Sequence, residues 1–456
     1  MTESGEAAAT FCATLVDEWI RGGVAHAVVA PGSRSTPLAL ALAARTDLAV
    51  HVHHDERSAA FTALGLGLAT GRPAVVVTTS GTAAVELHPA VVEAHQAGVP
   101  MLVVTADRPP ELHGVGAPQT VDQTHLFGGA VRWFVQPGPP TIETASSWRS
   151  LASRSIAEAV GAPAGPGPVH LNLAFRDPLV ASPGPLPPGR AETQPWHATQ
   201  RTTGRLDPAI SGALAEMAAV ERGIIVAGTG AGDPSAVLAL ADATGWPVLA
   251  SPQSGCRRDH ASVITLADAI LRHAPTAAWL RPELVVRLGA PAASSVVAGW
   301  LAESGARQVA VDEYGRWYDA QRTADAVVHA DPTEVVQAIA RGAKGPRGDQ
   351  PRGRWEAVES TARAALVRVL DAHGAPTEPG TARSLLGALP DGASVVVSSS
   401  MPIRDVEWYG GVVGDVRVLA NRGANGIDGV VSTAVGVALA ARGTGVRTAV
   451  LVGDVA

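Results

Sequence analysis

Apolar and small residues in the stretch 55–71 predict an amphipathic helix. They fall at i, i+3, i+4, i+7 and i+8, at positions Ala60, Ala63, Leu64, Gly67 and Leu68. Gly65 and Gly67 lie inside this helix, although each glycine costs about 1 kcal/mol relative to alanine in a helix interior. We therefore expect another backbone or a flat ligand to approach the helix at these glycines. Gly71 ends the helix, and the apolar run 74–77 predicts a buried strand.

A similar pattern occurs near the C-terminus. Residues 428–443 again show an acid, a small-apolar helix and a glycine, followed by a predicted strand at 448–452 and the loop residues Gly453 and Asp454. Upstream, residues 28–34 parallel residues 395–401. We interpret this as a duplicated strand–loop–helix–strand unit. The alternative is that any two α/β domains share this general pattern.

Other strands and helices are predicted to alternate along the chain. Residues 8–20 and 37–44 predict helices, and strands are predicted at 24–30, 50–53, 101–106, 168–173, 223–227, 284–289 and 308–311. This alternation predicts parallel sheets with helices on both faces. Ligands of such sheets bind at the loops after the carboxyl ends of the strands. The polar residues at these loops are Ser33, Arg34, Glu56, Ser80, Thr82 and Arg108.

Two segments rich in loop-forming residues predict the domain boundaries. We interpret residues 183–203 and 343–353 as linkers. The fold class is therefore α/β, with three doubly wound parallel-sheet domains at 1–185, 186–345 and 346–456. The central domain has glycines 228, 230 and 232 after a strand, but an ordinary tight turn is favoured over a dinucleotide site because the full fingerprint is missing. The chain ends just past the strand 448–452, so we expect the third domain to be incomplete and the sequence to be a C-terminally truncated fragment.

Composition excludes several classes of function. The chain has 456 residues, a formal net charge of −7 and no block of basic residues, so no nucleic-acid partner is expected. Cys12 and Cys256 are the only cysteines, which excludes a disulfide framework and a cysteine-based zinc site. Without a basic leader or an apolar run of about 20 residues, we expect a cytoplasmic protein with no membrane insertion.

The loop motifs, taken in order, resemble one enzyme family. They are Pro31-Gly32-Ser33-Arg34, Asp55-Glu56-Arg57, Thr79-Ser80-Gly81-Thr82, Ala106-Asp107-Arg108-Pro109, Asn421-Arg422-Gly423-Ala424-Asn425-Gly426-Ile427-Asp428-Gly429 and Gly453-Asp454. This series resembles the 2-succinyl-5-enolpyruvyl-6-hydroxy-3-cyclohexene-1-carboxylate synthases of menaquinone (vitamin K2) biosynthesis. These transferases use thiamine diphosphate and Mg²⁺ (or Mn²⁺) to decarboxylate 2-oxoglutarate and add the succinyl-semialdehyde carbanion to isochorismate. The resemblance makes the three domains pyrimidine-binding, central and diphosphate-binding in type, the last represented by its N-terminal part only.

The resemblance also implies a role for each matching residue. Glu56 is the expected catalytic acid, which hydrogen-bonds the aminopyrimidine ring; the alternative role is that of an acid at a helix N-terminus, as expected for Asp55. The expected cofactor-binding residues are Glu56, Ser80, Gly81, Thr82, Ser400, Met401, Ile427, Gly453 and Asp454. The expected substrate-binding residues are Ser33, Arg34, Arg108 and Gln119 on the isochorismate side, and Ser400, Arg404 and Arg422 on the 2-oxoglutarate side. Asp454 is the expected metal ligand; in the superfamily an asparagine about 25–30 residues later completes this oxygen-ligand site, and no such position follows here.

Several positions depart from the family pattern. Pro118 and Ser399 stand where relatives have asparagine, and Ser295 lies where relatives often have lysine. His51 and His53 alternate on a strand, and we interpret them as structural because their spacing suits a closed metal site poorly.

Two other functions remain open. One is another thiamine-diphosphate lyase or an acetolactate-synthase-like enzyme with a flavin in the central domain, and the other is an inactive fragment. In the superfamily the cofactor lies between two subunits, so a homodimer or homotetramer is expected.

Overall fold

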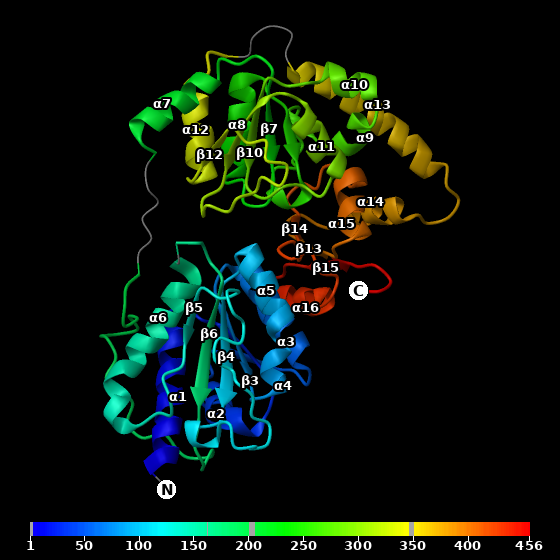
Figure 1. Cartoon of the computed structure of the whole chain (residues 1–456). Helices are drawn as coiled ribbons and strands as arrows, with labels where there is room; N and C mark the ends of the chain where they lie inside the picture. The colour runs from blue at the N-terminus through cyan, green and yellow to red at the C-terminus, as the bar shows by residue number, and fades with distance from the viewer. Residues whose placement is uncertain (1–2, 162, 200–205, 346–350) are drawn as a thin grey trace. The chain divides into compact units, whose positions relative to one another are not determined.

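The computed structural model describes residues 3–161, 163–199, 206–345 and 351–456. The chain divides into two compact units, and each is described by itself. The first unit contains residues 1–201, 421–450 and 454–456, and the second contains residues 202–420 and 451–453. Both contain parallel strands and helices (Figure 1), which confirms the α/β fold class with parallel sheets.

The first unit is built on a six-stranded sheet with the order β2-β1-β3-β4-β6-β5. All neighbouring strands are parallel. The strands are β1 (His26–Val29), β2 (Ala49–Val52), β3 (Ala74–Thr78), β4 (Met101–Asp107), β5 (Trp133–Val135) and β6 (Pro168–Ala174). Every residue of β3, β4 and β6 is buried, as expected for parallel strands covered on both faces.

Helices cover both faces of this sheet. Alternate residues of β3 lie in opposite cores: Val75 and Val77 pack in one, and Val76 in the other. The first core is closed by α1 (Glu3–Arg21), α2 (Thr36–Ala43) and α6 (Trp148–Gly161), and the second by α3 (Glu56–Thr70) and α5 (His88–Ala97). The remaining short elements are η1 (Ser33–Ser35), α4 (Thr82–Val85), η2 (Pro110–Leu112) and η3 (Ile142–Ser147). The predicted doubly wound arrangement is therefore confirmed for this unit.

Helix α16 (Val430–Ala440) also belongs to the first unit and packs on α3 (Figure 1). A Cβ added at Gly65 would lie 2.0 Å from the carbonyl oxygen of Thr433, and one at Gly436 would lie 2.1 Å from that of Thr62. The expected approach of another backbone at Gly65 is confirmed. At Gly67, a Cβ would lie 2.7 Å from the carbonyl oxygen of Pro100, so this glycine also faces a backbone.

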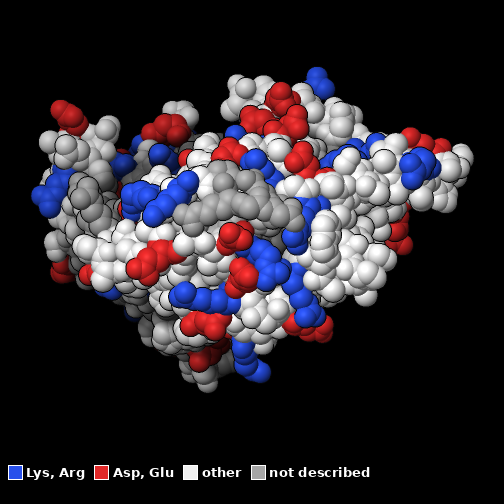
Figure 2. All heavy atoms as spheres, turned by 90° about the horizontal axis from the view of Figure 1, so that it is seen from above, with Lys and Arg blue, Asp and Glu red and all other residues white. Residues whose placement is uncertain are grey.

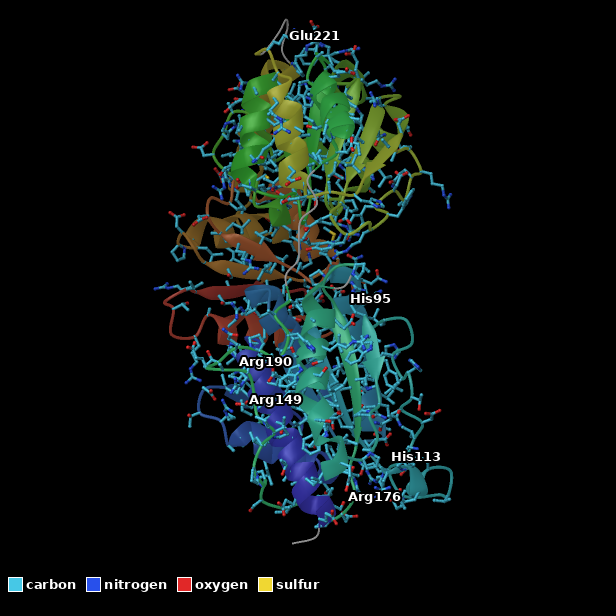
Figure 3. All side chains as sticks on the ribbon, turned by 90° about the vertical axis from the view of Figure 1, so that its left-hand side faces the viewer. His95, His113, Arg149, Arg176, Arg190 and Glu221 are labelled. Carbon is cyan, nitrogen blue, oxygen red and sulfur yellow. The ribbon has the colours of Figure 1, made fainter. Side chains whose placement is uncertain are left out.

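The segment 183–199 contains no helix or strand in its described part and runs beside α1 and α6. Arg149 of α6 donates from Nε to the carbonyl oxygen of Pro187 at 2.8 Å and from Nη1 to Oε2 of the fully buried Glu18 at 2.9 Å. Figure 3 labels Arg149 and Arg190 along this side of the unit. The end of the predicted linker, at 200–203, lies outside the described residues.

The second unit contains a six-stranded parallel sheet with the order β12-β11-β10-β7-β8-β9. Its strands are β7 (Gly223–Ala227), β8 (Val248–Ala250), β9 (Val263–Ile264), β10 (Leu284–Leu288), β11 (Arg307–Val311) and β12 (Ala326–Val328). Its helices are α7 (Pro208–Met217), α8 (Pro234–Thr244), α9 (Ala267–Leu271), α10 (Ala274–Trp279), α11 (Ser295–Glu303) and α12 (Pro332–Arg341), with the short η4 (Pro252–Ser254).

The prediction of a linker up to residue 353 is wrong at its end, because α13 (Pro351–Asp371) already begins at Pro351. Trp355 of this helix is buried and packs edge-to-face against Trp300, with ring centroids 5.8 Å apart. This aromatic pair fixes the start of α13 on the core of the second unit. Residues 346–350 of the predicted linker lie outside the described residues.

The second unit also holds α14 (Glu378–Ala388), β13 (Ser394–Val397), α15 (Met401–Tyr409) and β14 (Arg417–Leu419). Strands β13 and β14 are parallel. After β13, the backbone N–H of Ser398 donates to the carbonyl oxygen of Leu451 at 2.8 Å, at the end of β15 (Thr448–Leu451). The tripartite boundaries at 185 and 345 stay a prediction.

The described surface mixes charges of both signs. On the face shown in Figure 2, acidic and basic side chains alternate with uncharged ones. Among the described helices, none combines the length and the apolar character that crossing a bilayer requires.

Candidate functional site

Five loops meet at one edge of the first-unit sheet, because the carboxyl ends of parallel strands lie on the same side. Residues Ser33 and Arg34 follow β1, Glu56 follows β2, and Ser80 follows β3. Arg108 follows β4, and Asp177 follows β6. Figure 3 shows His113 and Arg176, from the loops after β4 and β6, at this same end of the sheet. The fold therefore places the predicted residues that follow β1, β2, β3 and β4 on one edge of this sheet.

The loop Ser80–Gly81 has a backbone shape that favours glycine. Gly81 has φ 82° and ψ −139° at the N-cap of α4, a region that residues with a side chain rarely occupy. Ser80 is buried, and its Oγ donates to the carbonyl oxygen of Gln119 at 2.9 Å. In return, Gln119 Nε2 donates to the carbonyl oxygen of Ser80 at 2.9 Å. Gln119 itself has a positive φ of 56°, so both sides of this contact hold unusual conformations.

Two arginines lie beside this loop. The Arg108 guanidinium donates from Nη1 to Ser80 Oγ, and Arg34 donates from Nη1 to the carbonyl oxygen of Phe175 at 2.8 Å. Burial, and then the positive charge of Arg34, lower the pKa of Arg108 below its usual value. The Nε atom of Arg34 is buried without a hydrogen-bond partner among the described residues. Asp177 Oδ2 lies 3.7 Å from Arg34 Nη1. Two neighbouring guanidinium groups are suited to a carboxylate or phosphate.

Glu56 is the first residue of α3, and the preceding Asp55 is its N-cap. Asp55 Oδ1 accepts from the backbone N–H of Ser58 at 2.7 Å, so the capping role expected for Asp55 is confirmed. Glu56 is partly exposed and follows β2, at the carboxyl edge of the sheet. Its catalytic role stays a prediction.

A second group of predicted residues lies in the loop 421–428 of the first unit. Arg422 is partly buried and Ile427 is 38% exposed. The buried Glu93 of α5 accepts from the backbone N–H groups of Gly423 at 2.6 Å and Ala424 at 2.7 Å. Burial raises the pKa of Glu93, against the opposing effect of these amide donors. Sequence reasoning missed Glu93; its one signal was an acid among the apolar positions of the helix 88–97.

The predicted residues that follow β13 lie in the second unit. Ser400 is the N-cap of α15, with φ 73° and ψ −133°, and Met401 and Arg404 follow in the first turn. Ser399 is buried, and Ser295 begins α11. Gly453 is in the second unit and Asp454 in the first, and both stay predicted ligands.

The histidine pair on the first-unit sheet fits a structural role. His26 Nδ1 of β1 lies 3.3 Å from His51 Nε2 of β2, and their rings are stacked with centroids 5.6 Å apart. Burial lowers the pKa of both rings. Within the described part of the chain, no group of three or more His, Cys, Asp or Glu side chains could hold a metal ion.

The donor chemistry of the first unit fits the aminopyrimidine part of thiamine diphosphate. A carboxyl group at Glu56 and the hydroxyl and amide groups of the loop 80–82 lie at one sheet edge, and such groups hydrogen-bond ring nitrogens. Asp454 is the one predicted metal ligand and is exposed. A Mg²⁺ ion bridging phosphates needs only one or two protein oxygens, so a single acid remains compatible with this metal.

Comparison with known proteins gives the family. Residues 10–126 match the thiamine pyrophosphate enzyme, N-terminal TPP binding domain, and residues 190–360 match the middle domain of thiamine pyrophosphate enzymes. The chain is 46% identical over 469 residues to the 2-succinyl-5-enolpyruvyl-6-hydroxy-3-cyclohexene-1-carboxylate synthase of Halobacterium salinarum, covering 97% of this chain and 78% of the relative. The chain belongs to this synthase family.

Other relatives carry the same name. The synthase of Thermobifida fusca is 44% identical, covering 97% of this chain and 78% of the relative. The synthase of Geobacillus kaustophilus is 41% identical, covering 96% of this chain and 77% of the relative. The family resemblance and the thiamine-diphosphate dependence predicted from the loop motifs are therefore confirmed.

Proposed function

We propose that the chain is a thiamine-diphosphate-dependent synthase of menaquinone biosynthesis. It decarboxylates 2-oxoglutarate and transfers the succinyl-semialdehyde unit to isochorismate, giving 2-succinyl-5-enolpyruvyl-6-hydroxy-3-cyclohexene-1-carboxylate. The observation that supports this reaction best is the paired Arg34 and Arg108 beside Ser80 and Gln119, in a chain that belongs to the synthase family. Such a cluster suits an acceptor that carries carboxylates.

The first unit provides the acceptor side and the pyrimidine side. Arg34 and Arg108 bind a carboxylate of isochorismate, with Ser33 and Gln119 beside them. Glu56 holds a proton at a ring nitrogen of the aminopyrimidine, and Ser80, Gly81 and Thr82 line the ring. The cofactor, when bound, supplies the electron sink for decarboxylation, while the protein supplies placement and charge.

The remaining predicted residues complete the proposal. Arg404, Arg422 and Ser400 bind the carboxylates derived from 2-oxoglutarate. Met401, Ile427 and Gly453 contact the cofactor, and Asp454 binds Mg²⁺ or Mn²⁺. The domains are pyrimidine-binding at 1–185, central at 186–345 and diphosphate-binding from 346.

We also propose a homodimer or homotetramer in the cytoplasm. In the superfamily the cofactor is shared between subunits, which supports the oligomer. Both cysteines are buried free thiols, and burial raises the pKa of each. This cysteine usage agrees with a reducing compartment. Light scattering of the purified protein tests the oligomer, and a monomer at high concentration would refute it.

The experiment is turnover of 2-oxoglutarate with isochorismate by the purified protein, compared with Glu56→Gln. We expect the variant to lose activity by about 100-fold or more, because general acid–base groups contribute on that order. Asp55→Asn is the matched control, since it retains a cap for α3 and changes the neighbouring acid. Equal activity of Glu56→Gln and the parent would remove Glu56 from the reaction, whereas an inactive parent would contradict the proposed function itself.

A further inference from the structure

A chain of buried polar side chains lies beneath the Ser80–Gly81 loop. Gln123, Asn172 and Asp107 have exposed fractions of 1%, 0% and 1%. Asn172 lies on β6, Asp107 ends β4, and Gln123 lies in the segment between β4 and β5. Buried polar groups require hydrogen-bond partners, and here the partners are mainly one another.

The hydrogen bonds among these three side chains run in one direction. Asp107, when ionised, only accepts: its Oδ1 accepts from the backbone N–H of Arg108 at 2.7 Å, and its Oδ2 accepts from Asn172 Nδ2 at 2.8 Å. The amide oxygen of Asn172 therefore faces the other way and accepts from Gln123 Nε2 at 2.7 Å. That leaves Gln123 Oε1 to accept from the backbone N–H of Gly81 at 3.0 Å.

Two further groups hold the middle of the chain. Thr105 Oγ1 donates to Asn172 Oδ1 at 2.8 Å and lies 2.8 Å from His170 Nε2. Burial lowers the pKa of His170 to about 3, so the ring is neutral. Because the Thr105 hydroxyl donates its one hydrogen to Asn172, it accepts from Nε2 of His170. A second hydrogen bond of Gln123 Nε2 runs to the carbonyl oxygen of Ala106 at 3.3 Å. The orientation of both amides is thus fixed on every side.

The two ends of this series of hydrogen bonds reach the proposed site. One end holds the N–H of Gly81, whose backbone is in a region that few residues occupy. The other end holds the N–H of Arg108, whose guanidinium contacts Ser80. The loop after β3 and the loop after β4 are therefore tied together below the surface that carries Arg108 and Gln119.

We propose that Gln123 is a positioning residue of the synthase. Acting through Asn172 and Asp107, it holds the Ser80–Gly81 backbone in the shape that orients Arg108 and Gln119 toward the acceptor substrate. This inference rests on the proposed function. Gln123 contacts neither substrate nor cofactor in this role.

Gln123→Met tests the proposal, because methionine has a similar length and makes no such hydrogen bonds. We expect the KM for isochorismate to rise by about 10-fold or more, since the buried N–H of Gly81 loses its acceptor. The KM for 2-oxoglutarate should rise less, because Arg108 and Gln119 are the proposed acceptor-side residues, whereas the Ser80–Gly81 loop affects donor binding only through the cofactor ring. Gln136→Met is the matched control: Gln136 is exposed, and its replacement should leave both constants unchanged.

Gln123→Glu provides a second test, because a purely structural role would not make the activity of this variant depend on pH. An ionised glutamate accepts from Gly81 but cannot donate to Asn172, whereas a protonated glutamate restores both hydrogen bonds. We therefore expect the activity of this variant, relative to the parent, to recover as the pH falls from about 8 to about 6, because burial next to an amide oxygen raises a carboxyl pKa. A variant-to-parent ratio independent of pH would overturn the directional hydrogen bonding.

Hydrogen exchange at the Gly81 amide separates this inference from the proposed function. In Gln123→Met the exchange should be about 10-fold faster or more than in the parent, with no change in Gln136→Met. If the parent lacks synthase activity, the proposed function fails while this exchange measurement still tests the hydrogen bond. If Gln123→Met does not fold, the pH dependence of the Gln123→Glu activity tests the hydrogen bond to Asn172 instead. An active parent with unchanged isochorismate KM in both Gln123 variants would disprove the positioning role.

Discussion

Ser400 occupies a backbone conformation that suits glycine, with φ 73° and ψ −133°. Gly81 has nearly the same conformation, φ 82° and ψ −139°, and is likewise the N-cap of a helix that follows a buried strand. The two positions differ in residue type: the loop after β3 has a glycine there, and the loop after β13 has a serine. Strain of this kind is retained where a side chain has a use, which supports the proposed ligand role of Ser400.

We predict that Ser400→Gly stabilises the second unit and lowers activity. Relief of the backbone strain should raise the free energy of unfolding by about 1 kcal/mol, after the greater freedom of glycine in the unfolded chain is subtracted. Ser400→Ala is the control, because it removes the same hydroxyl and keeps the strained Cβ. Urea unfolding and turnover of both variants check this; a stability gain in the alanine variant as well would show that the backbone is not the cause.

Asp405 should make stability depend on pH. Its side chain is buried, and Oδ1 has no hydrogen-bond partner within the described part of the chain. Burial, and then the charge of Glu378, raise its pKa from 3.8 to about 6. The unfolded chain therefore releases this proton at lower pH than the folded protein does. Its effect on stability is absent below about pH 4, grows as the pH rises to about 6, and is a constant penalty above that.

Asp405→Asn removes this penalty, so its stability relative to the parent should rise with pH. The gap in the free energy of unfolding should grow by about 2 kcal/mol between about pH 4 and about pH 7. Asp415→Asn, at an exposed position, serves as the control and should show no such growth. A gap of constant size across this range, measured by urea unfolding, would argue against a buried charge at Asp405.

At the scale of elements, the contact between α3 and α16 depends on two glycines. The backbones approach so closely that a Cβ at Gly65 or Gly436 would overlap a carbonyl oxygen of the opposite helix. We predict that Gly436→Ala destabilises the first unit by about 2–4 kcal/mol, in the range of overpacking in a close contact. Gly299→Ala in α11 is the control, because nothing lies within 4 Å of its added Cβ and alanine favours a helix. Thermal unfolding should move in opposite directions for the two variants.

Periodicity and glycine placement could be predicted at this scale, whereas single polar contacts could not. Gly65 indicated the close approach of another backbone, because a glycine in a helix interior is destabilising relative to alanine. The predicted linker extended wrongly into α13, because the contact of Trp355 with Trp300, with ring centroids 5.8 Å apart, forms only in the folded chain. Glu93 and Gln123 carry no periodic signal, since their roles depend on amides of residues distant in sequence. The loop motifs identified the proposed site, but the hydrogen bonds that support it appear only in three dimensions.

For the whole molecule, membership of the synthase family predicts that the chain binds thiamine diphosphate. The first unit carries Glu56 and the loop 80–82, and the matched family regions cover residues 10–126 and 190–360. A ligand that binds only the folded state stabilises it by RT ln(1 + [L]/Kd), about 2.7 kcal/mol at a hundred times Kd. We therefore predict that thiamine diphosphate with Mg²⁺ at this concentration raises the Tm of the full chain by about 3 °C, because the entropy of unfolding grows with chain length.

Removal of each component shows which groups produce this shift. Chelation of Mg²⁺ should abolish most of it, because the metal neutralises the diphosphate that the protein must hold. Glu56→Gln should reduce the shift, since a carboxyl contact to the aminopyrimidine is weakened, while Asp55→Asn should change the starting Tm and leave the shift itself intact. An unchanged Tm at a saturating concentration of the cofactor would support the alternative of an inactive protein. A shift that survives chelation unchanged would instead place the cofactor in a mode that does not use Asp454 or any other metal ligand.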